Sequence, residues 1–279
     1  MPVPLPAALA PGLSDHLCHA YAGVDELRRQ AGPYLLDGVA LGQRPLVVAP
    51  ARELALAHEI ATSATAAASD GTTVGVAELG QVLGSGSIDA GAALQALDGA
   101  LSRALDAGHS GLRVVALLTH IATEPFLRQS WATWEHAVGQ WQSLRPVASA
   151  CCFDRGVLGD KAVQELACLH PRVLTTGAPV PFRLYFRGGQ LVLEGEVDSF
   201  STPLLASAVT HVDATPGERV VIDARGLTFL NHRGLTTLVD GLARRSGGVT
   251  LLGGPALVRR MCVGLGIPED VIDVLPCPW

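Results

Sequence analysis

Leu112-Arg-Val-Val-Ala-Leu-Leu118 is the stretch that decides the fold class of this chain. It is a short, continuous apolar run that follows Gly108 and Gly111 and precedes a helical pattern from Glu124 to Leu144. Short apolar strands that alternate with helices are typical of a parallel sheet covered on both faces. The stretch therefore indicates an α/β fold.

The same alternation continues on both sides of this strand. Apolar residues recur at helical spacing from Val24 to Val39, and the strand-like run Pro45 to Ala49 follows them. A second helical pattern covers Ile88 to Ala107, and a strand is predicted from Val147 to Cys152. We expect an N-terminal parallel sheet with helices on both faces.

A different pattern opens the C-terminal part. Phe182-Arg-Leu-Tyr-Phe186 and Gln190-Leu-Val-Leu193 flank Arg187-Gly188-Gly189, a turn suited to a tight hairpin because glycine accepts positive φ. Alternating helices and strands follow, expected at Thr202 to Val212, Arg219 to Ala224, Arg233 to Ser246, Val249 to Leu252 and Pro255 to Leu265. This order predicts a small mixed sheet with packed helices.

The segment from Pro171 to Pro181 separates the two patterns, because it combines prolines and a glycine with small polar residues. We therefore expect a disordered tail over residues 1–14, a first domain over 15–174, a linker over 175–181 and a second domain over 182–276.

Composition limits the function classes. The net charge of -6 leaves no basic face for nucleic acid, so no direct nucleic-acid partner is expected. The apolar runs are shorter than the roughly 18 residues of a membrane span, and the proline-containing N-terminus has no basic region of a secretory signal. The six cysteines have no framework spacing, which favours reduced thiols and a cytoplasmic location.

Three blocks of the second domain resemble one family. They are Leu193-Glu-Gly-Glu-Val-Asp198, Val220-Val-Ile-Asp223 and Leu227-Thr-Phe-Leu-Asn-His-Arg-Gly-Leu235. In order and spacing they are similar to STAS domains of the anti-sigma-factor-antagonist type. The resemblance implies a partner-binding face at Asp198, Ser199, Asn231, His232, Arg233 and Gly234. It also implies an anti-sigma factor or a related kinase-like protein as partner.

The turn at Asn231 departs from that family. Asn231 is expected to cap a helix, whose free amides suit an anion. Family members are commonly phosphorylated on a serine at the position of Arg233, which cannot accept that phosphate. The surface is therefore an unswitched binding face, a cationic anion-recognising site formed with His232, or a structural relic; we favour the first. Asp198, Ser199 and Ser201 are equally explained as a strand end and a helix cap.

The first domain resembles the MEDS domain, a sensory domain of methylotroph and methanogen regulators that is related in fold to RecA/KaiC-like ATPases. The resemblance covers Asp15 to Leu174 and rests on the order of short motifs. These are His16-Leu-Cys-His-Ala-Tyr21, Pro33-Tyr-Leu-Leu-Asp-Gly-Val-Ala-Leu-Gly-Gln43, Gly111-Leu-Arg-Val114, Trp134-Glu135, Phe153-Asp154 and His170-Pro171. The family's tyrosine-aspartate and tryptophan elements are replaced here by Phe153-Asp154 and Thr119-His120.

Candidate ligand-binding residues follow from these motifs. They are His16, Cys18, Tyr21, Arg113, Glu135 and Asp154, which mix charge and aromaticity at predicted strand and helix ends. His16, Cys18 and His19 also suggest a metal site that Cys168 and His170 would complete, but their spacing fits no standard finger. We favour buried histidines and small apolar cysteines, and so expect no metal and no cofactor. Cys151 and Cys152 are expected on opposite faces of a core strand, which argues against a redox pair.

Three functions fit the sequence. The first is a regulator without catalytic activity, in which the first domain senses a small molecule and the second binds a protein. No Walker A loop is present and Lys161 is the only lysine, so ATP hydrolysis is not expected, and the Gly84-Ser-Gly-Ser87 segment is interpreted as a flexible loop. The second is a small-molecule or metal-binding enzyme that uses the His/Cys cluster, with His16, Cys18 or Glu135 as nucleophile or base. The third is a scaffold.

Overall fold

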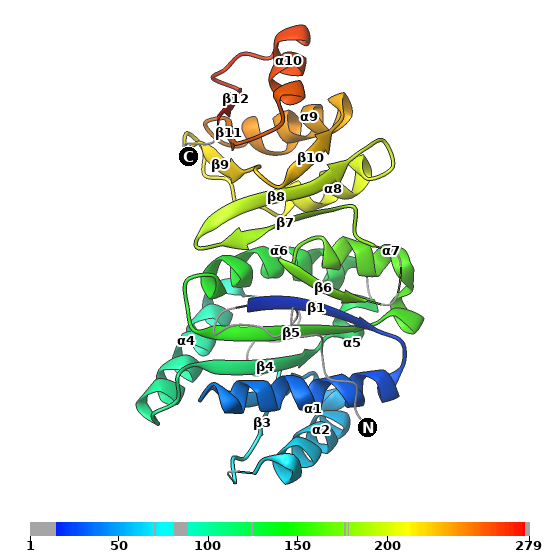
Figure 1. Ribbon diagram of the computed structural model, residues 1–279, viewed down its shortest axis with the longest axis vertical. Helices are drawn as coiled ribbons and strands as arrows, with labels where there is room; N and C mark the ends of the chain where they lie inside the picture. Colours follow the sequence, from blue (N-terminus) through cyan, green and yellow to red (C-terminus); the bar gives the residue numbers. More distant parts are fainter. Residues whose placement is uncertain are drawn as a thin grey trace. The chain divides into compact units, whose positions relative to one another are not determined.

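The chain divides into two compact units, each built on its own six-stranded sheet, in a computed structural model (Figure 1). The structure describes residues 15–69, 71–80, 89–123, 125–175, 177 and 179–276. The predicted disordered tail at 1–14 and the Gly84-Ser-Gly-Ser87 loop lie outside the described residues. The α/β fold class is confirmed in both units.

The first sheet is entirely parallel, with strand order β3-β2-β4-β5-β1-β6. Its strands are β1 (Asp15–Tyr21), β2 (Arg44–Ala49), β3 (Gly75–Glu78), β4 (Leu112–Leu117), β5 (Val147–Asp154) and β6 (Arg172–Thr175). β5 is buried along its length except at Asp154, as a continuous apolar run in the middle of a parallel sheet requires. β1 lies beside it, so both strands can place side chains deep inside the unit.

Helices alternate with these strands along the chain. They are α1 (Val24–Ala40), the short 3-10 helix η2 (Ala51–Glu53), α2 (Leu54–Ala67), α4 (Ala90–Asp106), α5 (Thr119–Thr123), α6 (Pro125–Gln142) and α7 (Arg155–Ala167). One hydrophobic core joins Leu27 of α1 and Ile60 of α2 to Leu17 of β1 and Ala150 of β5. Since side chains alternate along a strand, His16 and the residues that flank Ala150 face the opposite side of the sheet.

Seven elements of this part of the chain were not assigned from the sequence: β1, β3, β6, η2, α2, α5 and α7. β3 and β6 are four-residue edge strands, each hydrogen-bonded to one neighbour, so neither carries a long apolar run. β6 occupies Arg172–Thr175, at the start of the segment in which the sequence indicated a domain boundary. α2 has an alanine-rich sequence that resembles low complexity, yet its Ala57, Ala61 and Ala64 are buried in the core.

The second sheet is mixed and has strand order β10-β8-β9-β11-β12, with β7 antiparallel to β8. Its strands are β7 (Phe182–Arg187), β8 (Gln190–Val197), β9 (Val220–Asp223), β10 (Leu227–Leu230), β11 (Val249–Leu252) and β12 (Ile272–Leu275). The predicted hairpin is confirmed, with Gly188 and Gly189 at φ values of 56° and 78°. β10 and β12, which the sequence analysis did not assign, are again four-residue strands with one partner each.

Along the edge that faces away from β7, strand β8 pairs with two different strands. Leu191 and Val192 pair with β9, whereas Gly195 to Val197 pair with β10. The helices of this unit are α8 (Thr202–Thr210), α9 (His232–Leu238), the π-helical segment η3 (Val239–Ala243) and α10 (Ala256–Gly264). The single helix predicted from Arg233 to Ser246 is thus α9 continued by a π-helical turn. Within the described residues, no helix has both the length and the apolar character to cross a membrane.

Candidate functional site

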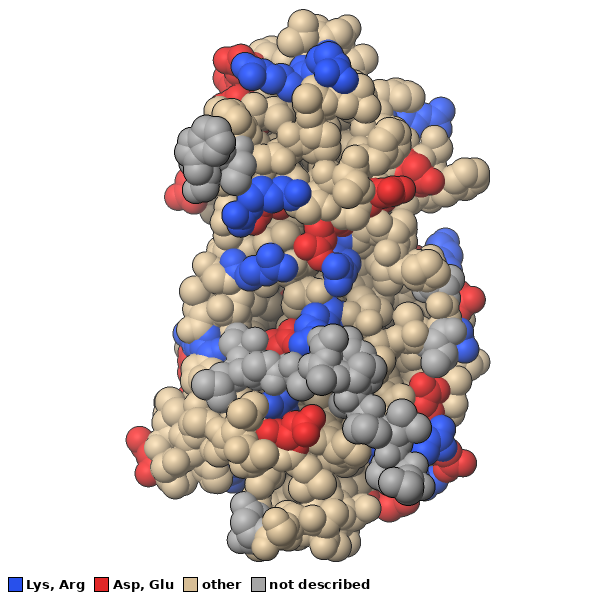
Figure 2. Space-filling view, in the orientation of Figure 1, with Lys and Arg blue, Asp and Glu red and all other residues tan. Residues whose placement is uncertain are grey.

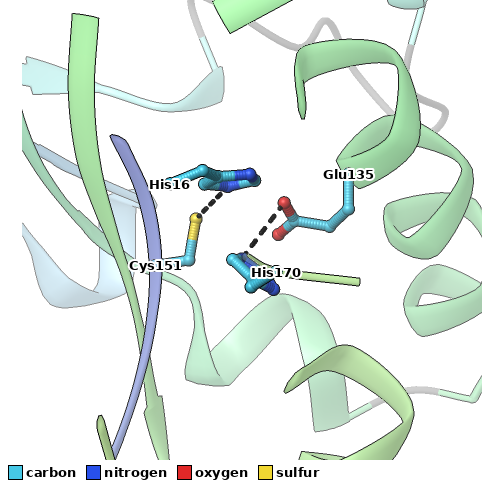
Figure 3. Close-up of side chains that lie close together, drawn as sticks. All are labelled: His16, Glu135, Cys151 and His170. Atoms are coloured by element: carbon cyan, nitrogen blue, oxygen red, sulfur yellow. Dashed lines mark hydrogen bonds and ion pairs between the residues drawn. The ribbon is translucent and has the colours of Figure 1, made fainter. Parts of the chain in front are cut away.

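Two pairs of buried polar side chains stand out, His16 with Cys151 and Glu135 with His170 (Figure 3). His16 and Cys151 come from neighbouring strands β1 and β5, in which residue 18 pairs with residue 151. Glu135 comes from α6, and His170 lies two residues before β6. The first pair therefore joins two central strands, and the second joins a helix to the turn that leads into an edge strand.

The end of helix α6 is fixed to strand β5. Gln142 at this end donates through Nε2 to the carbonyl of Val147 at 3.0 Å, and its Oε1 accepts from the Ser149 hydroxyl at 2.9 Å. Val147 and Ser149 belong to β5, so the helix end and the strand are joined close to Cys151.

Both pairs are buried and closely spaced. His16 Nε2 is 3.3 Å from the Cys151 sulfur, and His170 Nε2 is 3.5 Å from Glu135 Oε2. The Glu135 and His170 side chains are fully shielded from solvent. A carboxylate buried at this depth requires compensation by a cation or by hydrogen bonds.

His170 has a defined orientation because its Nδ1 lies 2.9 Å from the Leu166 carbonyl. A carbonyl oxygen only accepts, so Nδ1 carries the proton. In a neutral imidazole the lone pair is then on Nε2, which faces Glu135.

The opposite face of the same strands carries a separate set of the predicted residues. His19 Nδ1 is 3.9 Å from the Cys152 sulfur, and Tyr21 bonds the Thr119 hydroxyl at 3.2 Å. Burial lowers the pKa of His19 to about 4, partly opposed by Glu26, and burial also raises the pKa of Tyr21. These groups stay uncharged at neutral pH and lie on the face opposite to His16 and Cys151.

Arg113 is also on that face and is completely buried. Its guanidinium lies 4.8 Å from the centre of the Tyr34 ring in a cation–π contact. Burial raises the pKa of Tyr34, an effect that the nearby Arg113 reduces. Arg113 is therefore a core cation of the α1–β4 contact.

Two of the six predicted ligand-binding residues each lie beside another buried polar side chain: His16 beside Cys151, and Glu135 beside His170. Cys18 is buried on the same strand as His16. Asp154 is at the end of β5, where its carboxylate accepts from the Gly156 amide at 2.8 Å. Of the other residues considered for a metal, His19 lies near Cys152, and the Cys168 sulfur lies 3.5 Å from the Glu165 carbonyl.

Cys151, which sequence reasoning assigned to the core alone, lies beside His16. The expected alternation is nevertheless seen, since Cys151 contacts His16 while Cys152 contacts His19. The alternation shows that one of the two cysteines shares a face with His16, but the choice depends on the register between β1 and β5. That register is a long-range property that a single sequence does not specify.

A second candidate surface lies in the second unit, at the start of α9. Asn231 caps this helix as predicted, and its side-chain oxygen accepts from the Gly234 amide at 2.6 Å. The Thr202 hydroxyl lies 3.3 Å from the same oxygen and also donates to the Asp198 carbonyl at 2.6 Å. These bonds join the loop after β8 to the turn before α9, so two of the family-like blocks meet.

Asp198 is used within its own loop. Its Oδ1 accepts from the Ser201 amide at 2.8 Å, from the Ser201 hydroxyl at 2.8 Å and from the Phe200 amide at 2.9 Å. The Ser201 bonds are the main reason that the pKa of Asp198 lies below its usual value. Asp198 and Ser201 therefore form a strand end followed by a capped turn, which is the second of the two interpretations that the sequence allowed.

The other residues of this surface differ in exposure. His232, Arg233 and Ser199 are exposed, whereas Gly234 is buried and a Cβ there would lie 2.6 Å from Leu230 Cδ1. Phe200, which the sequence analysis did not select, is 92% exposed in the loop that carries Ser199. An aromatic ring so open to water, in a loop that Thr202 joins to the turn before the exposed Arg233, has the composition of a protein-binding patch.

Charged residues of both signs are interspersed over the face seen in Figure 2. This distribution agrees with the net charge of -6 and gives no broad cationic surface on that face.

The fold defines the first unit as an α/β domain with a parallel sheet, and His16 and Cys151 are ligand-type side chains in its interior. The family model described as "MEthanogen/methylotroph, DcmR Sensory domain" (MEDS) matches residues 15–171, which is more than half of the chain. The chain therefore belongs to the MEDS family. A comparison with curated proteins finds no match.

Proposed function

We propose that this chain is a regulatory protein without catalytic activity, in which the MEDS domain responds to a small ligand and the second unit binds a protein partner. The family match supports the sensory role of the first unit. The second unit supports the binding role through its opening hairpin, its βα order and the capped turn at Asn231, which are the features of the STAS resemblance. The expected partner is an anti-sigma factor or a related kinase-like protein.

The observation that carries the partner-binding proposal is the exposed Phe200 beside the turn with His232 and Arg233. The loops that carry these residues are tied together by Thr202, so they form one preorganised surface. Because Arg233 occupies the position at which STAS relatives are phosphorylated, this surface is proposed to bind its partner without that switch.

Binding of the full chain to a panel of purified serine-kinase-type anti-sigma factors tests this proposal. We expect one member to bind, and Phe200→Ser or Arg233→Asp to weaken that binding by more than about tenfold, as loss of an interface anchor does. Val263→Ser is the matched control, because Val263 is 80% exposed on α10 and lies outside this surface. Absence of binding across the panel, or equal loss in the control, would contradict the proposal.

The distance of 3.3 Å between Cys151 and His16 favours one second candidate, an enzyme with a cysteine nucleophile and a histidine base. Both side chains are buried, so a substrate would have to open the layer formed by α6. Incubation of the full chain with ATP and with ester and amide substrates distinguishes the two functions. Turnover that disappears in His16→Ala would replace the regulator proposal by the enzyme.

A further inference from the structure

We infer that the carboxyl ends of the strands in the first sheet form a binding site for a small organic ammonium ion, built around His19, Tyr21 and Glu53. This inference rests on the proposed sensory function and names the class of ligand. All the residues that carry it belong to the first unit. Three observations support it: the position of these residues in the sheet, the acceptor atoms among them that have no partner, and the charges around them.

The site lies where four parallel strands end side by side. β2, β4, β5 and β1 are consecutive neighbours in the sheet. Their ends carry, in this order, Glu53 in η2, Thr119 at the start of α5, Asp154 and Tyr21. The carboxyl ends of parallel strands share one edge of the sheet, and open α/β folds bind their ligands at this edge.

Hydrogen bonds hold three of these strand ends together. The Tyr21 hydroxyl lies 3.2 Å from Thr119 Oγ1, which also accepts from the Asp154 amide at 2.9 Å. The centre of the His19 ring lies 5.7 Å from the centre of the Tyr21 ring, and both side chains are buried. The strand ends are therefore preorganised around two aromatic rings.

Two buried acceptor atoms at this edge have no hydrogen-bond partner within the part of the chain that the structure describes. They are Oε2 of Glu53 and Nε2 of His19, a residue that is only 3% exposed. The Cys152 thiol donates to the Ala150 carbonyl at 3.5 Å, so its sulfur faces Nδ1 of His19 at 3.9 Å as an acceptor. Nδ1 then carries the proton of the neutral ring, and Nε2 presents a lone pair. A ligand with N–H groups removes the cost of leaving both buried acceptors without a donor.

The charges around the two rings favour a cation. Burial is the main reason that the pKa of Glu53 lies above its usual value; His120 opposes this shift and Asp154 adds to it. Burial also raises the pKa values of Tyr21 and Cys152, and the negative charge of Glu53 contributes to both shifts. Glu53 therefore lies within electrostatic reach of the two side chains that flank the His19 ring.

These properties together define the class of ligand. An ammonium group supplies N–H donors to Nε2 of His19 and Oε2 of Glu53, and it neutralises the carboxylate. At His19, where burial lowers the pKa, Glu26 adds an opposing negative potential. The face of the Tyr21 ring attracts the same cation. The ligand is therefore a primary or secondary ammonium ion, because an anion is repelled and a neutral alcohol has one donor and no charge.

Isothermal titration calorimetry of the full chain near neutral pH tests this class of ligand. Ethyl-, propyl- and butylammonium chlorides are titrated against a sodium chloride blank, and tetramethylammonium, propanol and propionate are compared with them. We expect at least one alkylammonium ion to bind with a dissociation constant below about 1 mM. Tetramethylammonium has the charge without an N–H group, and propanol has a donor without the charge, so both should bind more than about tenfold more weakly.

Glu53→Gln keeps the size of the side chain and removes its negative charge, so it should weaken alkylammonium binding by more than about tenfold. Glu59→Gln is the matched control, because Glu59 is an exposed carboxylate of α2 that pairs with Arg28. It should bind as the wild-type chain does. Asp154→Asn should also weaken binding, and it provides a second variant if Glu53→Gln does not fold by circular dichroism.

The inference is overturned if none of the alkylammonium ions binds, or if Glu53→Gln and Glu59→Gln bind them alike. Binding of propanol or propionate in their place would overturn the ammonium assignment and keep the sensory function. The partner-binding test of the proposed function uses no amine, so failure of the ammonium site and failure of partner binding are observed separately.

Discussion

At the scale of single residues, the first unit contains buried ionisable groups on both faces of one sheet. His16 and Cys151 meet on the face covered by α6, while His19 and Cys152 meet on the face covered by α1 and α2. The sequence predicts this separation, because neighbouring side chains of a strand alternate. It does not predict which partners meet across the sheet, since those depend on strand order and register.

His19 gives the domain a stability that depends on pH. Burial lowers its pKa from 6.5 to about 4, so the unfolded chain binds a proton between these pH values and the folded chain does not. Stability is therefore fully present above pH 6.5 and falls as the pH drops toward 4. We expect a loss of about 2 kcal/mol between pH 6.5 and pH 5 from this residue.

Urea unfolding at pH 5, 6 and 7 measures this effect. His19→Gln removes the titrating group and should flatten the dependence, even if its absolute stability is lower. His232→Gln, which changes an exposed histidine, should keep the wild-type slope. A slope that is the same in His19→Gln and in the wild-type chain would show that another group titrates.

At the scale of elements, helix α1 depends on a glycine in its last turn. A Cβ at Gly38 would lie 2.5 Å from both Cβ and Cγ of Arg113, whose side chain is fully buried. Alanine has a higher helix propensity than glycine, but the overlap of the new Cβ with Arg113 costs more stability than the propensity contributes. We expect Gly38→Ala to destabilise the chain by about 2 kcal/mol in thermal or urea unfolding.

The matched control is Gly99→Ala in the middle of α4, where the nearest atom to a new Cβ is the mobile end of Arg103. This substitution should stabilise the chain by up to about 1 kcal/mol. Opposite signs for two Gly→Ala changes in helices would separate packing from propensity. Equal signs would contradict the close contact between α1 and β4.

Strand β8 contains a glycine with a similar role. Gly195 has φ of +96°, and a Cβ there would lie 2.5 Å from the Pro181 carbonyl oxygen. This residue is the glycine of the Leu193-Glu-Gly-Glu-Val-Asp198 block and lies where pairing with β10 begins. We expect Gly195→Ala to cost about 3 kcal/mol of stability, because strain and overlap add.

Gly188→Ala is a useful comparison for this change. Gly188 also has positive φ, but no atom lies within 4 Å of its built Cβ. Only the conformational penalty applies, so we expect a loss of about 1 kcal/mol by the same unfolding measurement. A loss at Gly195 no larger than that at Gly188 would argue against the crowding by Pro181.

The elements that the sequence predicted well are those with long periodic patterns, such as α1, α4 and α6, or with a continuous apolar run, such as β4 and β5. β3, β6, β10 and β12 were missed because a four-residue edge strand has too few residues for a period to emerge. The candidate site was also predicted only in part. Glu135 and His16 were named from their types, but the contact between His16 and Cys151 depends on the pairing of β1 with β5.

At the scale of the whole molecule, each unit has a parallel-sheet interior whose central strands have two neighbours. β5 lies between β4 and β1 and is almost completely buried, whereas β3 pairs with β2 alone and is half-buried throughout. In the second sheet, β11 lies between β9 and β12, whereas β10 pairs with β8 alone. Stability against local opening should therefore differ strongly within each sheet.

Hydrogen–deuterium exchange of the full chain, followed by mass spectrometry of peptides, measures this difference. Opening a central strand breaks two ladders and exposes a core, so its amides exchange only through large openings, while edge amides exchange through local fraying. We expect β5 peptides to exchange at least about a hundredfold more slowly than β3 peptides, and β11 more slowly than β10. Exchange that is uniform across the first sheet would contradict the strand order, because every strand would then open as part of one cooperative unit.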